Sequence, residues 1–510
     1  MFESILFPGG KNNTICRSQP DCFYDLHLDQ LIDSIVKKEK FVDLSFLYYT
    51  PLSDLGDIQF RQSVFRDLLY PDTRKLLDTF SSKICALAVQ LDSAKDTLRS
   101  ESSSQNNYLL YGHFLDYAEH YCKDLDQFET SLQDLNPSSE GLCHSIQSIE
   151  ELYHSKFYQD LHQTLMTLRE DFNRERYCML IKNDTIHVKK YNGESNLSEK
   201  ITDVFKKFQV EDSKNYLQSL SETPYANYIE GEVLQCLSRV YPELFKRLTS
   251  FIHQFSDFMD PGLLQFCKEL RFYFSWLDQI ELLEECGLPF CFPEFGTTDL
   301  FANGFFDIVL AKKIPKQIVK NDFRFRPPEK ILVITGPNQG GKTTFARAVG
   351  QIHYLASLGL SVPGTSACLL PTDHILTHFE REEFLRNQSG KLEDDLTRLY
   401  DLLKCSTDRS LIIINEIFAS TVLEDALKLG KHMMEELILK GSVCVIVTFL
   451  DQLADYSKET VSMVSTVDRT CPDKRTFQVV RKPPDGLAYA MTLAEKHGLT
   501  YEQILRRITS

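Results

Sequence analysis

The stretch Ile331–Thr344 constrains this chain more than any other part of it. It reads Ile-Leu-Val-Ile-Thr-Gly-Pro-Asn-Gln-Gly-Gly-Lys-Thr-Thr, so apolar β-forming residues run directly into a glycine. The spacing that follows, Gly-x4-Gly-Lys-Thr, is typical of a phosphate-binding loop between a strand and a helix. The competing interpretation is a turn whose glycines serve only the backbone, and the buried type of strand before it disfavours that reading. The sequence therefore predicts a nucleotide site.

Each position of this loop suits a bound triphosphate. Gly336, Gly340 and Gly341 can adopt positive φ and turn backbone N–H groups inward at the start of a helix. Lys342 can reach the β- and γ-phosphates, and the hydroxyl of Thr343 can bind Mg²⁺. These residue types in this order predict a nucleoside triphosphate bound together with magnesium.

A second segment supplies the rest of the chemistry. Leu411–Ile414 reads as a buried strand, and the polar pair Asn415 and Glu416 follows it. A strand beside the phosphate-loop strand would deliver both side chains to the metal and to an attacking water. Aspartate is usual at the first position, so the neutral amide of Asn415 predicts weaker magnesium binding. Glu416 is predicted to activate the water, and the competing interpretation is that the pair only starts a surface turn.

Composition excludes several classes of protein. A chain of 510 residues can form roughly two to four domains. The formal net charge is −16, so any contact with DNA has to come from a local basic patch. The 14 cysteines show no zinc-site spacing, which indicates buried, reduced thiols. The sequence shows neither a signal peptide nor an apolar stretch of membrane-spanning length, and we expect a cytoplasmic protein without membrane contact.

The hydrophobic pattern changes along the chain and predicts an α/β fold. Residues 1–285 have mostly helical spacing, interrupted by a β-hairpin that turns near Asn183 and Asp184. A break near residues 286–296 is followed by alternating strand and helix patterns. The expected elements are a helix over Thr343–Leu358, a strand over Leu411–Ile414, a helix over Glu424–Lys440 and a strand over Val443–Val447. This alternation predicts a mostly parallel, doubly wound sheet.

A basic run leads into the phosphate loop. Its members are Lys312, Lys313, Lys316, Lys320, Arg324, Arg326 and Lys330. Such runs are usually solvated faces. Because this one precedes the loop directly, the alternative is that it shapes the rim of the nucleotide site or a partner surface.

The same loop carries a resemblance to a known family. Thr335–Thr344 closely resembles the ATP-binding loop of the MutS family, in which Pro-Asn stands inside the glycine-rich segment. Gly359–Thr377 and Asp485–Ile504 are similar to later segments of that family's ATPase domain. The resemblance is strong over about 331–450 and weak at Thr50–Gln62.

The resemblance implies a particular division of the chain. Residues 286–510 would form a C-terminal P-loop ATPase domain of the ABC type, with a mostly parallel sheet. Residues 1–285 would form a helical core and lever domain with a reduced clamp-like insertion at about 172–215. We expect a short, divergent member without the N-terminal mismatch-recognition and connector domains.

The resemblance also implies the ligands and the site residues. ATP is the expected nucleotide and Mg²⁺ the expected metal, held by Thr343 and Asn415, with Lys342 and Glu416 as catalytic residues. The predicted ATP-binding residues are Gly336, Pro337, Asn338, Gln339, Gly340, Gly341, Lys342, Thr343 and Thr344, among which Asn338 would approach the γ-phosphate.

A partner subunit is implied as well. In this family a serine-containing signature loop of one subunit completes the nucleotide site of the other. The corresponding residues here are Ser389 and Gly390, which predicts a homodimer or a heterodimer with a related chain.

Two departures from the family pattern affect the expected rate. Phe449 follows Thr448 where the family has a histidine, so an imidazole near the γ-phosphate is lost. The family's Asp-Glu-Ile-Gly-Arg-Gly-Thr is Asn-Glu-Ile-Phe-Ala-Ser-Thr at Asn415–Thr421, so the glycine loop beyond the sheet is expected to be reshaped. Together with Asn415, Phe449 predicts slow hydrolysis.

Two functions fit these observations. The first is an ATPase that acts as a nucleotide-gated dimeric clamp on DNA in repair or recombination control, selective for DNA structure rather than for mismatches. The second is a slow, ATP-gated interaction protein that recruits a protein partner. The nearest local basic patch consists of Lys182, Lys189, Lys190, Lys206, Lys207 and Lys214, and a purely solvated role for these lysines stays open.

Overall fold

The computed structural model describes most of the chain. The described residues are 2–10, 16–100, 107–132, 135–182, 185–194, 224–380, 390–418, 421–468, 475–484, 500, 501, 504, 505 and 508. The chain divides into two compact units: unit 1 is Met1–Phe2, Lys75–Asn136 and Cys143–Lys268, and unit 2 is Glu3–Arg74, Pro137–Leu142 and Glu269–Ser510. The expected division into domains at residues 285 and 286 remains a prediction.

The described part of unit 1 is helical apart from one hairpin. Its helices, some of which start or end in unit 2, are α5 (Pro71–Ser100), α6 (Asn107–Leu132), α7 (Glu140–Tyr153), α8 (Lys156–Arg174), α10 (Pro224–Val240), α11 (Pro242–Gln254) and α12 (Pro261–Glu284). Helices α5, α10, α11 and α12 each begin at a proline, whose fixed φ suits the first helical position. The predicted long helices are therefore present.

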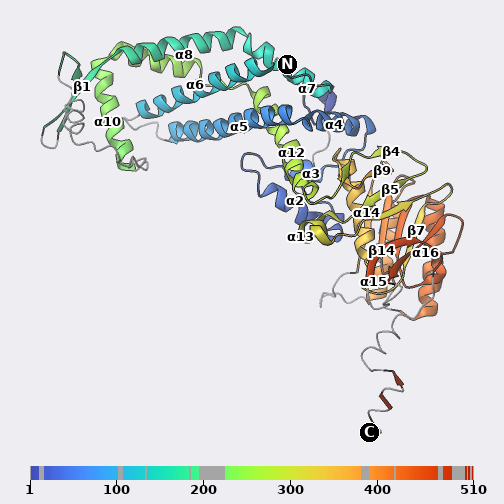
Figure 1. Ribbon diagram of the computed structural model, residues 1–510. Helices are drawn as coiled ribbons and strands as arrows, with labels where there is room; N and C mark the ends of the chain where they lie inside the picture. The colour runs from blue at the N-terminus through green and yellow to red at the C-terminus, as the bar shows by residue number, and fades with distance from the viewer. Residues whose placement is uncertain are drawn as a thin grey trace, which may run out of the picture. The chain divides into compact units, whose positions relative to one another are not determined.

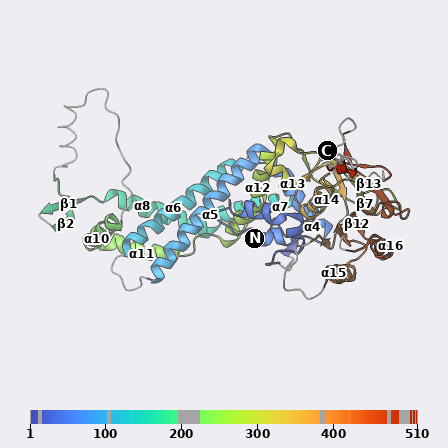
Figure 2. The same ribbon diagram turned by 90° about the horizontal axis from the view of Figure 1, so that it is seen from below.

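Aromatic side chains hold the long helices of unit 1 together. Figures 1 and 2 show α5, α6 and α8 running side by side. Phe80 of α5 stacks on Phe128 of α6 with ring centroids 4.0 Å apart. Tyr158 of α8 donates a hydrogen bond of 3.0 Å to the Asp126 carboxylate of α6. The aromatic residues of this region thus serve its core.

The predicted hairpin is present in unit 1. Strands β1 (Tyr177–Lys182) and β2 (Thr185–Lys190) pair antiparallel, with Lys182 opposite Thr185. The turn residues 183 and 184 lie outside the described residues. Lys189 forms an ion pair of 2.5 Å with Glu194, and Lys190 lies 5.0 Å from the ring centroid of Tyr241.

Unit 2 contains the strands of the predicted α/β fold. Its first helices are α1 (Cys22–Leu26), α2 (Leu28–Val36), α3 (Ser45–Tyr49) and α4 (Leu55–Leu68), and its later ones are α13 (Ile308–Lys313), α14 (Lys342–Ser357), α15 (Lys391–Cys405) and α16 (Leu423–Lys440). The short 3₁₀ helices are η1 (Pro8–Gly10), η2 (Pro315–Gln317) and η3 (Asp451–Leu453). Helices α14 and α16 match the two predicted helices to within one residue at each end.

A six-stranded sheet forms the centre of unit 2. Its order is β10 (Ile375–His378), β11 (Leu411–Asn415), β12 (Val443–Val447), β7 (Ile331–Thr335), β13 (Thr460–Val467) and β14 (Arg475–Arg481). All neighbours are parallel except β13 and β14. The sheet is therefore mostly parallel, as predicted.

One detail of the predicted sheet was wrong. The strand that carries Asn415 was expected beside the phosphate-loop strand, but β12 lies between β11 and β7. Both β11 and β7 are buried apolar strands, and the pattern of a single buried strand contains no information about its neighbours. The carboxyl end of β11 nevertheless lies at the same edge of the sheet as the end of β7.

Helices cover both faces of this sheet. Ile331, Ile412 and Cys444 belong to one apolar cluster with residues of α15 and α16. On the opposite face a Cβ atom at Gly350 of α14 would lie only 2.7 Å from the Ile413 side chain, so α14 packs closely on β11. Because side chains alternate along a strand, both faces are apolar, which is why the strands read as continuous hydrophobic runs.

Smaller sheets of unit 2 flank the central one. β3 (Phe290–Cys291) pairs with β8 (Val362–Pro363), and the other sheet has the order β4 (Glu294–Phe295), β9 (Ser366–Leu369), β5 (Phe301–Phe305) and β6 (Asn321–Arg324). This second sheet supplies Phe305 and Asn321 to the site described below.

The end of α14 is anchored by a buried arginine. Arg61 of α4 is fully buried and donates hydrogen bonds to the carbonyl oxygens of Leu6 (2.9 Å) and Leu358 (3.1 Å). Burial lowers the pKa of Arg61 to about 10, which leaves the group charged at neutral pH. Two carbonyls and an adjacent aromatic ring, Phe7 at 4.9 Å, offset part of the cost of burying this charge.

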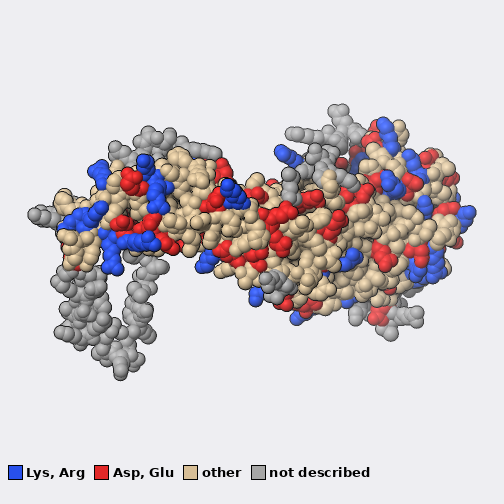
Figure 3. Space-filling model, turned by 90° about the horizontal axis from the view of Figure 1, so that it is seen from above, with Lys and Arg blue, Asp and Glu red and all other residues tan. Residues whose placement is uncertain are grey.

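The charged surface is mixed. On the face shown in Figure 3, acidic and basic side chains are interspersed and form no continuous basic area among the described residues. Within the described part of the chain, none of the helices combines the length and the apolar character that crossing a bilayer requires.

Candidate functional site

The loop between β7 and α14 has positive φ at two of the three predicted glycines; Gly340 does not adopt it, and Gln339 does, with φ of +59°. The φ angle is +115° at Gly336 and +92° at Gly341, and Gly341 is the N-cap of α14. Asn338 and Gln339 lie exposed at the tip of the loop. A helix N-terminus preceded by such a turn presents backbone N–H groups to an anion.

Strand β13 closes the back of this loop through Ser465. The buried hydroxyl of Ser465 donates a hydrogen bond of 2.7 Å to the carbonyl oxygen of Gly340. A Cβ atom at Gly340 would lie 2.1 Å from that hydroxyl and 3.0 Å from the carbonyl oxygen of Pro337. Gly340 is therefore required because no space exists for a side chain. Sequence reasoning missed Ser465, since a single serine 125 residues away carries no motif signal.

Lys342 is held inside the loop. Its side chain is 4% exposed, and its ammonium group donates to the carbonyl oxygens of Gly336 (3.0 Å) and Pro337 (3.1 Å). The ring of Phe449 lies 4.6 Å from the same nitrogen. Burial lowers the pKa of Lys342, and the nearby Glu416 carboxylate opposes this shift. The predicted loss of an imidazole at position 449 thus places an aromatic ring over the lysine.

Thr343 and Asn415 meet as predicted, although β11 is one strand farther away than expected. The Thr343 hydroxyl donates a hydrogen bond of 2.9 Å to the amide oxygen of Asn415. Both groups provide oxygen atoms, which Mg²⁺ prefers. The pair therefore fits a magnesium ion that takes its other ligands from phosphates and water, with no carboxylate from Asn415.

Glu416 lies in the same cavity as Lys342. Its φ is +58°, and its N–H donates a hydrogen bond of 2.9 Å to the carbonyl oxygen of Val447. Burial raises the pKa of Glu416 above its ordinary value, while Lys342 lowers it and Glu380 raises it further. A half-buried carboxylate with a raised pKa is suited to accept a proton from water near neutral pH.

Phe418 occupies the place of a glycine in the family pattern. Its φ is +63°, so the backbone keeps the left-handed conformation that a glycine adopts at no cost. The Phe418 ring is buried in the apolar cluster beneath α15 and α16. Phe418 thus has a backbone conformation that a glycine could also adopt. Residues 419 and 420 lie outside the described residues, so the expected change in the shape of this loop stays a prediction.

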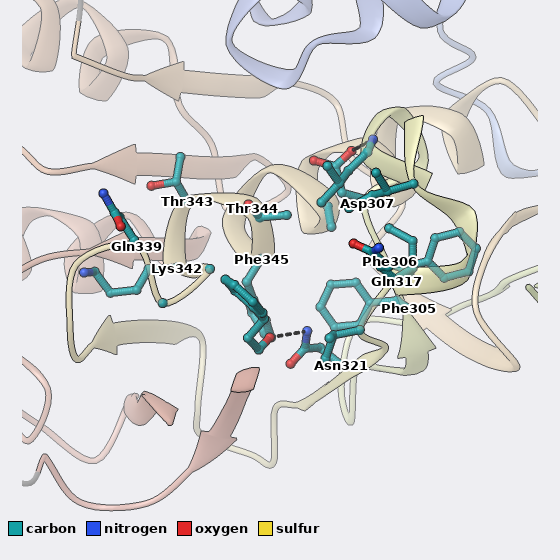
Figure 4. A pocket seen from close by; sticks show the side chains of 18 of the residues that line it. Phe305, Phe306, Asp307, Gln317, Asn321, Gln339, Lys342, Thr343, Thr344 and Phe345 are labelled. Carbon is teal, nitrogen blue, oxygen red and sulfur yellow. Dashed lines mark hydrogen bonds between the residues drawn. The ribbon is translucent and has the colours of Figure 1, made fainter. Parts of the chain in front are cut away.

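One cavity of about 560 Å³ is lined by many of the predicted residues, but Gly336, Pro337, Asn338 and Asn415 are not among them. Figure 4 shows Gln339, Lys342, Thr343 and Thr344 on one side of it. We call this side the phosphate end; the cavity-lining residues at this end are Gln339, Gly340, Gly341, Lys342, Thr343, Thr344 and Glu416.

The opposite side of the cavity is apolar and was not predicted from the sequence. We call it the base end; its lining residues include Phe305, Phe306, Asp307, Leu310, Ile314, Gln317, Ile318, Val319, Asn321 and Phe477. Phe477 comes from β14, and the other residues come from the segment 305–321, that is from β5, α13, η2, β6 and their connections; their spacing matches no nucleotide-binding motif. An apolar pocket with a few polar groups beside an anion site suits a purine nucleotide.

None of the lysines and arginines of the basic run lines this cavity. The cavity-lining residues between positions 312 and 330 are Ile314, Gln317, Ile318, Val319 and Asn321. The ammonium group of Lys312 instead donates a hydrogen bond of 2.9 Å to the amide oxygen of Gln279, and burial lowers the pKa of Lys312 to about 8. Arg324 pairs with Asp299.

The predicted signature loop is only partly visible. Ser389 lies outside the described residues, and Gly390 is the exposed N-cap of α15. Their role toward a partner subunit stays a prediction.

Comparison with known proteins bears on this geometry. The sequence model of MutS domain V matches residues 332–504, a range that includes the loop, Asn415 and Glu416. This part of the chain therefore belongs to the MutS domain V family. The DNA mismatch repair protein MutS of Thermotoga petrophila is 24% identical over 288 residues, which are 54% of this chain and 35% of that protein.

A second relative matches more of this chain. Endonuclease MutS2 of Thermus thermophilus is 24% identical over 374 residues, which are 71% of this chain and 45% of that protein. The matches thus span less than half of either relative. The domain V match begins in β7, so most of the base end, from Phe305 to Asn321, precedes it.

Proposed function

We propose that this protein binds ATP with Mg²⁺ in the 560 Å³ cavity and hydrolyses it slowly. The observation that carries the proposal is that Lys342, Thr343 and Glu416 line the same cavity as an apolar, aromatic base end. The loop N–H groups and Lys342 would bind the phosphates, and Asn338 would approach the γ-phosphate.

Thr343 and Asn415 would hold the magnesium ion. When bound there, Mg²⁺ offsets negative charge on the phosphates. Among the described residues no group of three or more His, Cys, Asp and Glu side chains could hold a metal, which suits an ion bound largely by phosphates and water. The absence of a carboxylate at position 415 is expected to weaken this binding.

Glu416 would accept a proton from the attacking water. Its raised pKa brings its proton affinity closer to neutral pH than that of an exposed glutamate. Phe449 offers no hydrogen-bond donor to the γ-phosphate, so less transition-state charge is stabilised. These residues support slow turnover.

We further propose that the protein acts on DNA as a nucleotide-gated dimeric clamp in repair or recombination control. One similar protein is named a DNA mismatch repair protein and another an endonuclease, and both names support a DNA ligand. In a homodimer, Ser389 and Gly390 would complete the partner's nucleotide site. The insertion at about 172–215 would serve as the clamp, and its Lys206, Lys207 and Lys214 lie outside the described residues.

A second candidate is a slow, ATP-gated interaction protein that recruits a protein partner. Lys189 of the hairpin is paired with Glu194, and the face in Figure 3 has no continuous basic area among the described residues. Because duplex binding depends on lysine and arginine contacts to phosphate, these observations favour a partner other than DNA.

Nucleotide and DNA binding by the purified protein test these proposals. ATP affinity and turnover are measured for the wild type, for Lys342→Ala and for the exposed control Lys316→Ala. We expect Lys342→Ala alone to lose ATP binding; wild-type affinity in Lys342→Ala would refute the site.

DNA binding separates the two functions. Branched, mismatched and single-stranded probes are tested with and without ATP across a range of salt concentrations. Saturable, ATP-dependent binding that weakens with salt supports the clamp, and no retention of any probe refutes it.

A further inference from the structure

The polar groups at the base end of the cavity are mostly committed to the protein itself. The Asp307 carboxylate accepts hydrogen bonds from Val309 N–H (2.9 Å) and from the Gln351 amide (3.0 Å). The Asn321 amide accepts from Val479 N–H (2.8 Å) and donates to the Phe477 carbonyl oxygen (3.3 Å). Both side chains are therefore held in place by the protein, which leaves each of them with less capacity to contact a bound base.

Gln317 is different. Gln317 is the last residue of the 3₁₀ helix η2, which begins at Pro315. The backbone N–H of Gln317 donates a hydrogen bond of 3.0 Å to the carbonyl oxygen of Ile314. The turn is thereby fixed, while the Gln317 side chain is exposed and lines the cavity. Figure 4 shows its amide directed into the space between the phosphate loop and Phe306. The side chain makes no hydrogen bond to any other residue that the structure describes.

The surroundings favour recognition through this amide. Ile314 and Ile318, which flank Gln317 closely in the sequence, also line the cavity, and Figure 4 shows Phe305 and Phe306 on the same side of it as Gln317. A base bound among these apolar side chains would cover the exposed amide, and a hydrogen bond shielded from water is stronger than one in solution. An unpaired donor or acceptor there also costs more, which is what makes a site selective.

A carboxamide matches one purine better than the other. It offers one donor and one acceptor side by side, and adenine presents the complementary pair, the N6 amino donor and the N7 acceptor. Guanine presents two acceptors, O6 and N7, at the same edge, so the amide oxygen would face O6.

We propose that Gln317 is a specificity-determining residue that selects adenine by pairing with its N6 amino group and N7. This proposal rests on the proposed binding of ATP in this cavity. It assigns base selection to a residue outside the glycine-rich loop and outside the range matched by MutS domain V.

Binding measurements with nucleotide analogues test the assignment. Affinities for ATP, GTP and 7-deaza-ATP, which lacks N7, are measured for the wild type and for Gln317→Leu. We expect the wild type to bind 7-deaza-ATP about fivefold more weakly than ATP, because the analogue loses one of the two hydrogen bonds of the bidentate pair. Gln317→Leu should bind ATP about tenfold more weakly and show no further loss with 7-deaza-ATP.

Two further variants test the hydrogen-bond donor of Gln317 and provide a control. Gln317→Glu keeps an acceptor for N6 but has no donor for N7, so it should also lose ATP affinity. Lys316→Ala, an exposed neighbour in the same turn, should bind ATP as the wild type does.

The outcomes separate this assignment from the proposed function. An equal penalty for 7-deaza-ATP in the wild type and in Gln317→Leu, or unchanged ATP affinity in Gln317→Leu, would overturn the role of Gln317 while leaving ATP binding in place. A wild type that binds none of the nucleotides would remove the proposed function, and this assignment with it.

Discussion

The two ends of the nucleotide cavity are built in opposite ways. The phosphate end is made by consecutive residues of one loop together with Glu416, and the loop backbone takes φ values of +115° at Gly336 and +92° at Gly341. The base end is made by mostly apolar side chains of the segment 305–321, which folds through several short elements, and by Phe477 of β14. One end therefore depends on backbone geometry and close contact, and the other on filling a volume.

This difference teaches which substitutions a site of this kind tolerates. A backbone cradle has no spare room, since a Cβ atom at Gly340 would overlap the Ser465 hydroxyl. An apolar wall accepts side chains of similar volume, because dispersion contacts and burial have little directional preference. Substitutions should therefore have large effects at the phosphate end and small ones among the apolar residues of the base end.

The largest effect is expected at Glu416. Glu416→Gln keeps the shape of the side chain but cannot accept a proton, so turnover should fall by about a thousandfold. ATP affinity should stay near that of the wild type, which single-turnover and equilibrium binding measurements check. Normal turnover by Glu416→Gln would show that another group activates the water.

The pH dependence of turnover tests the same residue. Only the deprotonated carboxylate can act as a base, and burial raises the pKa of Glu416 above its ordinary value of 4.5. Turnover should therefore fall as the pH is lowered through this raised pKa, at a higher pH than an exposed glutamate would give. The residual turnover of Glu416→Gln should not show this fall at low pH. If the fall persists in Glu416→Gln, another group is responsible for the titration.

A strong effect on binding is expected at Gly340. Gly340→Ala places a methyl group against Ser465 and the Pro337 carbonyl oxygen, and overpacking of this kind costs about 1–3 kcal/mol. We expect ATP affinity to fall by up to about a hundredfold. Gly112→Ala, where a Cβ atom would meet nothing within 4 Å, is the matched control. If Gly340→Ala and Gly112→Ala bind ATP equally well, the phosphate end tolerates added volume and does not differ from the base end in this respect.

A moderate effect is expected at the metal. Asn415→Asp adds a negative charge beside Thr343, so the magnesium concentration that supports half-maximal turnover should fall several-fold. A magnesium titration of turnover checks this. An unchanged titration midpoint would mean that the neutral amide does not limit metal binding.

The smallest effect is expected at the base end. Ile314→Leu conserves volume in the apolar wall, and such exchanges usually cost less than about 1.5 kcal/mol. We expect ATP affinity to change by less than about threefold, because Ile314 is already partly exposed. A loss of ATP affinity in Ile314→Leu as large as that in Gly340→Ala would show that the base end also has no room for a change in side-chain shape.

Much of the nucleotide site could be predicted from the residues alone. The loop, Lys342, Thr343, Asn415 and Glu416 follow from local spacing, and the structure places all of them around one cavity or in contact with a residue that lines it. The neighbour of β7 was predicted wrongly, because every buried strand of a parallel sheet has the same pattern.

Other parts of the site have no local signal. Ser465 supports Gly340 from another strand, and Phe449 lies over Lys342 from the end of β12. A serine or a phenylalanine occurs in many environments, so neither residue type predicts such a contact. Their roles become visible only when the sheet brings distant segments together.

The sequence by itself determined the chemistry of the phosphate end, because glycines, a lysine and a hydroxyl at fixed spacing can only be arranged in few ways along one short loop. The tertiary structure decided the base end and the placement of Gln317 within it, since a wall of apolar side chains is defined by which elements pack together. An apolar wall depends on the combined volume of many side chains and accepts several residue types, whereas the phosphate-binding loop depends on the backbone conformation and small size of a few consecutive residues.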